Sequence, residues 1–275
     1  MASSGSIRQP AVAGKFYPAD PDRLRHEVSQ LLHADSPVQP RRAVAVMAPH
    51  AGYVYSGGIA GKVFAGVEVP ARVILLCPNH TGLGQRIAVI ASGAFRVPGG
   101  DIPIDEQLAA AVLREVPGAV VDSDAHRFEH AIEVELPFLL ARQPHMKIVP
   151  IVLAGLTARE AIALGEGLAR AAAPWRDEVL LVASSDMSHY LPDATARKVD
   201  HQALEPLLAY DAAALYRTVV DYDISMCGFI PATAMLAYAH AMNAPAPELV
   251  GYATSGDAFG DRDRVVGYAG IIIPG

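Results

Sequence analysis

Three short apolar runs constrain the fold of this chain more than any other feature. Each has the length and composition of a strand buried on both faces, and each stops abruptly at a polar turn that contains a histidine. Helical patterns separate these runs along the chain, which predicts an α/β fold with a mixed central β-sheet flanked by helices. The apolar runs are residues 43–48, 72–76 and 178–183.

Length and composition predict one domain over residues 1–275. Of the 275 residues, 52% are apolar and 19% are charged, which suits a folded protein with room for one large α/β core. The net charge of −7 at pH 7 leaves no basic surplus to neutralise phosphates. We therefore expect no nucleic-acid partner, and we predict no particular oligomeric state.

The amino terminus gives an expectation about location. Its first ten residues, M-A-S-S-G-S-I-R-Q-P, lack the apolar core of a signal peptide. No apolar run in the chain approaches the length of a transmembrane helix. We expect a cytoplasmic protein without a membrane partner.

The residues that follow the three runs are candidate site residues. His50 follows the first run, His80 follows the second, and Asp186 and His189 follow the third. In open α/β sheets, ligands collect beyond the carboxyl ends of the strands. A single histidine in such a place is more often a core residue bonded to a backbone carbonyl. Because the pattern occurs at three strand ends, it favours a functional site.

The two cysteines are expected to be reduced thiols, because they form no CxxC pair and no disulfide framework. Cys227 precedes a helical segment that runs to about residue 243, and the positive end of a helix favours a thiolate. Cys77 lies where a strand ends and is expected to pack in the core. Two imidazoles and a thiolate suit a first-row metal, with positions left open for water, dioxygen or a chelating substrate.

The segment of residues 129–140 combines helical spacing with three carboxylates. His130 and Glu133 are three residues apart and can share one helix face. A polar site and a solvated face with an ordinary ion pair are both open interpretations of this segment.

Local patterns also predict the starts and connections of other elements. Ser56 is expected near the start of a helix after the first run, and Thr157 is expected to cap a helix over residues 157–173. Residues 86–90 and 94–97 read as two strands of a β-hairpin joined at a Ser-Gly turn.

Five motifs in this order closely resemble the Memo family, known in bacteria and archaea as AmmeMemoRadiSam system protein B. That family is similar in fold to the LigB-type class III extradiol dioxygenases, which are non-haem iron enzymes that cleave catecholic rings. The motifs are A-P-H-A-G-Y-x-Y-S-G at residues 48–57, P-N-H-x-G at 78–82, E-H-A-I-E-x-x-L-P-F at 129–138, S-S-D-M-S-H-Y at 184–190 and C-G-x-x-P at 227–231.

The resemblance implies a metal site formed by His50, His80 and Cys227. It implies Fe(II) as the metal, with copper as the alternative, because a thiolate is a softer ligand than the glutamate that completes the dioxygenase site. This departure in the third ligand means that ring cleavage does not carry over from the fold.

The resemblance also implies that His189 is the catalytic histidine, with Asp186 and His130 in supporting positions of the same pocket. Asp186 lies three residues before His189, near enough to orient its imidazole. Two functions follow as hypotheses. The first is a metal-dependent redox enzyme in which His189 moves a proton. The second is a non-enzymatic protein that captures a metal ion or a peptide, as the signalling role of eukaryotic members suggests. The small-molecule or peptide substrate is not predicted.

Overall fold

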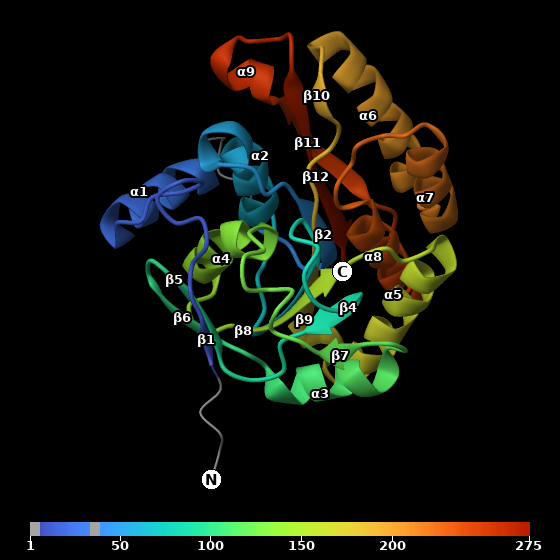
Figure 1. The fold of residues 1–275 in the computed structure, drawn as a ribbon. Helices are drawn as coiled ribbons and strands as arrows, with labels where there is room; N and C mark the ends of the chain where they lie inside the picture. The colour runs from blue at the N-terminus through green and yellow to red at the C-terminus, as the bar shows by residue number, and fades with distance from the viewer. Residues whose placement is uncertain (1–5, 34–38) are drawn as a thin grey trace.

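The computed structural model describes residues 6–33 and 39–275, and it is built around a nine-stranded mixed sheet (Figure 1). The strand order is β10-β12-β2-β9-β3-β8-β4-β7, with β11 paired to β12. The predicted α/β class with a mixed central sheet is confirmed. The strands are β2 (Ala43–Ala48), β3 (Arg72–Pro78), β4 (Ile87–Val89), β7 (Val120–Val121), β8 (Lys147–Leu153), β9 (Val179–Ser184), β10 (His189–Leu191), β11 (Glu248–Thr254) and β12 (Val265–Pro274).

The three predicted apolar runs are neighbours at the centre of this sheet. Strands β2, β9 and β3 pair in parallel, with Ala48 beside Ser184 and Leu76 beside Ala183. Residues in β2 and β9 are all buried, as expected for strands covered by helices on both faces. The carboxyl ends of the three strands therefore meet at one edge of the sheet.

Helices cover both faces of the sheet. Helices α2 and α4 pack on one face with α1 outside them, whereas α8 packs on the other face with α5 and α7 outside it (Figure 1). The helices are α1 (Pro21–Leu32), α2 (Tyr53–Ala65), α3 (Glu106–Glu115), α4 (Ala131–Arg142), α5 (Ala158–Ala172), α6 (Asp193–Leu208), α7 (Ala212–Asp221), α8 (Phe229–Ala241) and α9 (Ser255–Phe259), with a 3₁₀ helix at Ala173–Glu178.

A second, three-stranded sheet replaces the predicted hairpin. Strand β5 (Ala94–Val97) pairs with β6 (Gly100–Pro103) and with β1 (Ile7–Arg8), whereas β4 joins the main sheet beside β8. The hairpin prediction is wrong because β4 is buried throughout and needs strand partners on both sides. Gly93, with φ of 95°, turns the chain from one sheet into the other.

Two predicted helix starts have different outcomes. Thr157 is the N-cap of α5, and it forms a capping box with Glu160, which confirms the prediction. Helix α2 begins at Tyr53 after the cap residue Gly52, three positions earlier than expected. Ser56 lies inside the helix, where its hydroxyl donates to the carbonyl of Ala51 at 2.9 Å.

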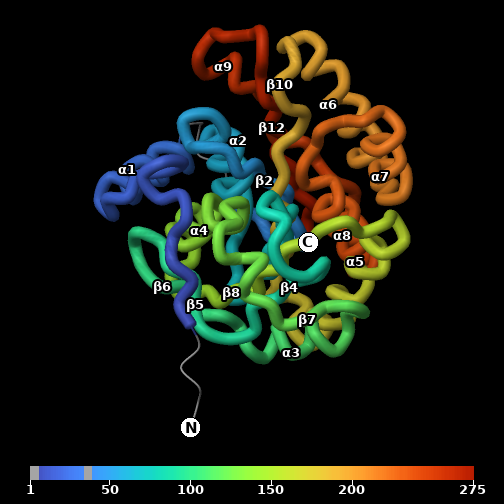
Figure 2. Tube along the Cα trace, in the orientation of Figure 1, coloured from blue at the N-terminus to red at the C-terminus, as the bar shows by residue number. Residues whose placement is uncertain are grey.

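The amino-terminal arm is anchored on α4 by a buried ion pair. Figure 2 follows this arm past β5 to α1, and along the way Arg8 enters the interior and pairs with Glu133. Glu133 is fully buried and also accepts a hydrogen bond of 2.7 Å from the Tyr17 hydroxyl. The solvated-face interpretation of residues 129–140 is therefore wrong.

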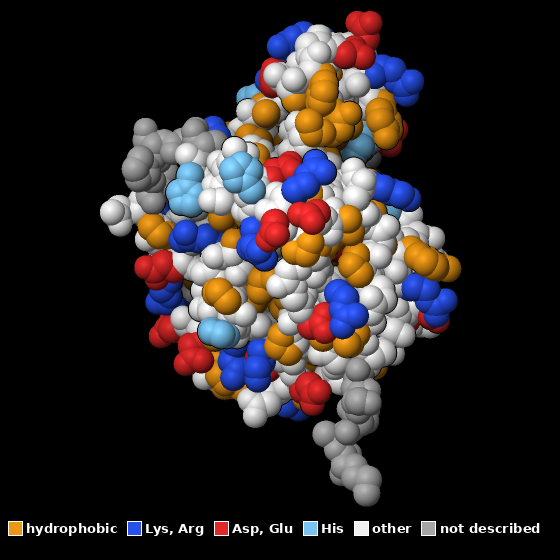
Figure 3. Space-filling model, turned by 90° about the vertical axis from the view of Figure 1, so that its left-hand side faces the viewer, with side chains coloured by type: hydrophobic (Ala, Val, Ile, Leu, Met, Phe, Trp, Pro, Cys, Tyr) orange, Lys and Arg blue, Asp and Glu red, His pale blue; other side chains and the backbone are white. Residues whose placement is uncertain are grey.

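The charged side chains in the surface view carry both signs. Acidic and basic side chains are interspersed over the face near α1 and α2 (Figure 3). Among the described residues, no helix is both long and apolar enough to cross a bilayer. Residues 1–5 lie outside the described residues. The cytoplasmic location stays a prediction.

Candidate metal centre

Three histidines meet at the edge where β2, β9 and β3 end. His50 lies two residues beyond β2 and His80 two residues beyond β3, while His130 is the N-cap residue of α4. Helix α4 packs against β3 and β9, which brings His130 to the strand ends. The fold thus gathers residues that are separated by up to 80 positions in the sequence.

The three imidazoles form a compact cluster. Their ring centroids are 5.2 Å apart for His50 and His80, 5.5 Å for His50 and His130, and 4.8 Å for His80 and His130. One ring nitrogen from each residue lies within 4.8 Å of the corresponding atoms of the other two. His50 is buried, whereas the other two rings are partly exposed.

Each imidazole has an oxygen atom near its Nδ1, and for His50 and His80 this contact is a hydrogen bond. The Nδ1 of His50 lies 2.8 Å from the Ser184 hydroxyl, and that of His80 lies 2.9 Å from Glu129 Oε1. The Nδ1 of His130 lies 3.4 Å from the same carboxylate oxygen. A partner at Nδ1 leaves Nε2 as the metal-binding atom, and such partners orient histidine ligands in metal sites.

The cluster fits a first-row metal ion. Bonds of about 2.1 Å to imidazole nitrogens place ligand atoms about 3 to 3.5 Å apart, so the observed cluster needs only a modest contraction. Imidazole is a ligand for zinc, copper, iron and nickel. The group formed by His50, His80 and His130 can therefore hold a metal ion.

Glu129 is the main anionic partner of the cluster. Its carboxylate accepts the backbone N–H groups of His80 at 2.6 Å, His130 at 2.8 Å and Ala131 at 3.0 Å. Burial opposes the charged forms of Glu129 and His80, but their mutual hydrogen bond and attraction outweigh it. The pKa of Glu129 falls to about 2 and the pKa of His80 rises above its usual value.

The other two imidazoles favour their neutral forms. Burial lowers the pKa of His50 well below its usual value, and repulsion from His80 and His130 lowers it further. Burial also lowers the pKa of His130, although the Glu129 charge opposes this shift. Neutral imidazoles are the forms that bind metals, so these two side chains are prepared for an ion at neutral pH.

Cys227 lies beside the cluster rather than among the three grouped imidazoles. Its Sγ is 3.4 Å from His50 Nε2 and accepts the backbone N–H of Asp186 at 3.3 Å. Burial, and then the Asp186 charge, raises the pKa of this thiol well above its usual value. The expectation that the start of α8 favours a thiolate is wrong without a bound cation. The assignment of Cys227 as a metal ligand stays a prediction.

Asp186 restrains His50 rather than His189. Its Oδ1 accepts the His50 backbone N–H at 2.8 Å, and its Oδ2 lies 4.0 Å from His50 Nε2. Burial raises the pKa of the Asp186 carboxyl. His189 is oriented by Ser225 instead, whose carbonyl lies 2.8 Å from Nδ1 and whose hydroxyl accepts the His189 backbone N–H at 2.8 Å.

Three residues that hold this site were not predicted from the sequence, namely Glu129, Ser184 and Ser225. Glu129 directly precedes His130, and Ser184 lies two residues before Asp186, so their motif positions were the available signal. Ser225 has no local signal, because its role depends on the approach of the α7–α8 connection to β10.

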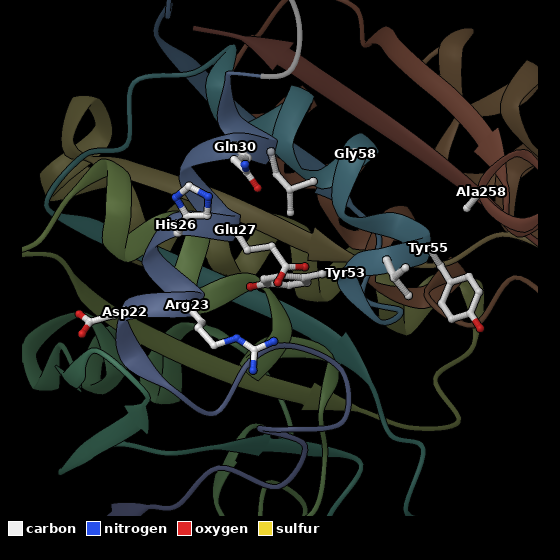
Figure 4. A pocket seen from close by; sticks show the side chains of 11 residues that line it. Asp22, Arg23, His26, Glu27, Gln30, Tyr53, Tyr55, Gly58 and Ala258 are labelled. Carbon is white, nitrogen blue, oxygen red and sulfur yellow. The ribbon is translucent and has the colours of Figure 1, made fainter.

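A separate surface pocket lies between α1 and α2 (Figure 4). It has a volume of about 890 Å³ and is lined in part by Glu27, Tyr53 and Tyr55. Tyr53 points inward and donates to the carbonyl of Val134 at 2.8 Å. None of the predicted site residues lines this pocket, so we assign it no part in the metal centre.

Comparisons with known proteins match nearly the whole chain. The family model described as Memo-like protein matches residues 8–272. MEMO1 family protein MK0963 of Methanopyrus kandleri is 40% identical over alignments that cover 96% of this chain and 98% of that protein. A MEMO1 family protein of Aquifex aeolicus is also 40% identical, over 97% of this chain and 98% of its own length.

One solved structure supports the fold. The uncharacterized protein JW3007 from Escherichia coli K12 superposes with a TM-score of 0.51 at 16% sequence identity. The superposition covers 83% of this chain and 99% of that one. At this level of identity the likeness concerns the fold alone.

Proposed function

We propose that this chain is a metal-dependent redox enzyme. The chain belongs to the Memo-like protein family, and its fold gathers three imidazoles at one edge of the sheet. The observation that carries the proposal is the cluster of His50, His80 and His130, in which Nδ1 of His50 and of His80 is hydrogen-bonded and one nitrogen of each ring lies within 4.8 Å of those of the other two.

Fe(II) is the proposed metal, with copper as the alternative. His50 and His80 are proposed ligands in either case. The third ligand is Cys227 according to the family resemblance, or His130 according to the distances between the ring nitrogens. Bound Fe(II) or copper would supply Lewis acidity and one-electron redox chemistry. The proposed relationship to LigB-type dioxygenases rests on the motif resemblance, and ring cleavage is not part of the proposal.

His189 is the proposed proton carrier. Donation from its Nδ1 to the Ser225 carbonyl leaves Nε2 as the atom that accepts and returns a proton. Ser225 holds His189 at two atoms, since its carbonyl meets the ring Nδ1 and its hydroxyl accepts the backbone N–H. A positioned histidine of this kind contributes about a hundredfold to ten-thousandfold in rate.

Oxygen consumption tests this proposal. The protein is reconstituted anaerobically with Fe(II) and then exposed to oxygen with a panel of catechols, phenols and thiols. We expect turnover with one substrate class, and a loss of about a hundredfold or more in His189→Ala with its metal retained. His201→Ala, an exposed change on α6, is the control and should keep full activity. No turnover across the panel, or loss of metal from His189→Ala, contradicts the enzyme proposal.

One observation favours a second function, that of metal capture without turnover. Cys227 lies beside His50, 3.4 Å from its Nε2, so a thiol is available as a fourth donor next to the three imidazoles. Four protein ligands fill a tetrahedral site and are typical of closed, non-catalytic centres. X-ray absorption of the Fe(II) protein separates the two functions. Four protein ligands without oxygen consumption support capture, and an exchangeable water ligand supports the enzyme.

A further inference from the structure

Glu135 is a fully buried carboxyl group without a hydrogen-bond partner among the described residues. It lies on α4, one helical turn beyond Ala131. Burial of a carboxyl group without a hydrogen-bond partner is destabilising, which marks Glu135 as a residue whose presence calls for an explanation. Glu135 takes no part in the metal centre described above.

Ser184 lies between Glu135 and the metal centre. It is fully buried at the end of β9, and its hydroxyl faces the carboxyl group of Glu135 without reaching full hydrogen-bond geometry. The same hydroxyl lies 2.8 Å from His50 Nδ1 and 3.4 Å from the Ala131 carbonyl. The three side chains therefore form a row from the interior of α4 to the imidazole.

The direction of the hydrogen bonds in this row follows from the chemistry of His50. An imidazole that offers Nε2 to a metal carries its proton on Nδ1, and that N–H must donate to the Ser184 oxygen. The Ser184 hydroxyl must then donate its own proton elsewhere. The Ala131 carbonyl is a long partner at 3.4 Å, and the carboxyl group of Glu135, one helical turn further on, is the other acceptor beside this hydroxyl among the described residues.

We propose that Glu135 is a positioning residue that acts through Ser184 to keep the His50 proton on Nδ1 and its Nε2 ready for a metal. This inference rests on the proposed function, because it concerns the same site, but its effect on His50 exists without metal.

The protonation state of Glu135 determines which substitution is the matched control. Burial raises the pKa of this carboxyl well above its usual value, although the Ser184 hydroxyl opposes the shift. Gln has the shape of a neutral carboxylic acid and keeps an oxygen acceptor, so Glu135→Gln should preserve the row. Glu135→Leu removes the acceptor and places an apolar group in an apolar environment.

Nuclear magnetic resonance of the metal-free protein tests the proposal. With ¹⁵N-labelled histidine, long-range proton–nitrogen correlations report which nitrogen of His50 carries the proton. We expect the Nδ1–H tautomer in the wild type and in Glu135→Gln, and a mixture with the Nε2–H tautomer in Glu135→Leu and Ser184→Ala. An unchanged tautomer in Glu135→Leu overturns the proposal.

A second readout separates positioning from a structural role. Anaerobic Fe(II) titration should show an affinity about tenfold to a hundredfold lower in Glu135→Leu and nearly unchanged in Glu135→Gln. The urea midpoint of Glu135→Leu should be no lower than that of the wild type, since an unpartnered buried carboxyl is removed. A lower midpoint with an unchanged tautomer makes Glu135 a structural residue and overturns the proposal.

The two readouts also distinguish the two proposals. Wild-type protein that fails to bind Fe(II) while the His50 tautomer shifts in Glu135→Leu contradicts the proposed function and supports the positioning role. Wild-type protein that binds Fe(II) with no tautomer shift in Glu135→Leu contradicts only the positioning role. Should Glu135→Leu fail to fold, Glu135→Met, which also lacks an acceptor, decides the question with the same measurement.

Discussion

His50 is held by neighbours that come from distant parts of the chain. Asp186 accepts its backbone N–H, Ser184 meets its Nδ1, and Cys227 lies beside its Nε2. Its pKa is lowered mainly by burial, so it stays neutral where a free histidine begins to charge. A neutral, fixed imidazole is the form that binds a metal without prior reorganisation.

The pH dependence of Fe(II) affinity should identify the third ligand. The pKa of His80 is raised, so protons compete with the metal for this imidazole as the pH falls through that pKa. The pKa values of His50 and His130 are lowered, so these two imidazoles stay neutral to lower pH. Above the raised pKa of His80, an imidazole site has an affinity that no longer changes with pH. Because the pKa of Cys227 is raised far above neutrality, thiolate ligation instead increases affinity about tenfold per pH unit over this range.

Anaerobic titration calorimetry in buffers of different ionisation enthalpy measures the protons released on binding. One proton per metal at about pH 8 supports Cys227 as a ligand, and none supports His130. Affinity that is also flat between neutral pH and about pH 5 would exclude both ligand sets and favour carboxylates as the donors.

Alkylation should distinguish the two cysteines. Cys77 is fully buried on β3 and Cys227 is partly exposed, and burial raises the pKa of both thiols. In native metal-free protein we expect slow alkylation of Cys227 and none of Cys77, because only the thiolate reacts. Added Fe(II) should slow Cys227 further. Mass spectrometry that finds Cys77 modified first, or both thiols protected equally by metal, contradicts this account.

The junction between α8 and β9 sets the position of Cys227. Gly228 precedes α8, and a Cβ atom there would lie 2.3 Å from the Ser184 carbonyl and 2.4 Å from Ser185 Cβ. Its backbone N–H donates to the Ser185 hydroxyl at 3.1 Å. The close approach of these two backbones places the cysteine at the end of the strand.

Gly228→Ala should therefore be destabilising. Overpacking at this junction should lower the free energy of unfolding by about 1 to 3 kcal/mol or more, and it should weaken Fe(II) binding. The matched control is Gly58→Ala on α2, where a Cβ meets nothing within 4 Å and removal of glycine from a helix adds about 0.5 to 1 kcal/mol. Urea unfolding measures both. Similar stabilities for the two variants would contradict the packing argument.

Local sequence patterns predicted individual elements better than their pairing. The apolar runs became β2, β3 and β9, and Thr157 capped α5, since burial on both faces and capping are local properties. The pairing of β4 and β5 was not predictable, because two neighbouring strands joined at a Gly turn can belong to one sheet or to two. Gly93 has the same sequence signal in either arrangement.

The whole molecule decides which site residues meet. Positions His50 and His80 were predictable from strand ends, since a parallel sheet brings those ends together. The meeting of His130 with them depends on the packing of α4 over β3 and β9, and α4 is anchored by the buried pair of Arg8 and Glu133. Pairing across 125 positions has no local sequence signal.

The most direct test of the metal centre is anaerobic equilibrium dialysis of the protein against Fe(II). The cluster of three imidazoles predicts about one ion per chain in the wild type, and loss of that ion in the double variant His50→Ala, His80→Ala. The double variant His26→Ala, His201→Ala, which removes two exposed helical histidines, should bind as the wild type does. Equal Fe(II) binding by the wild type and the His50→Ala, His80→Ala protein would contradict the account.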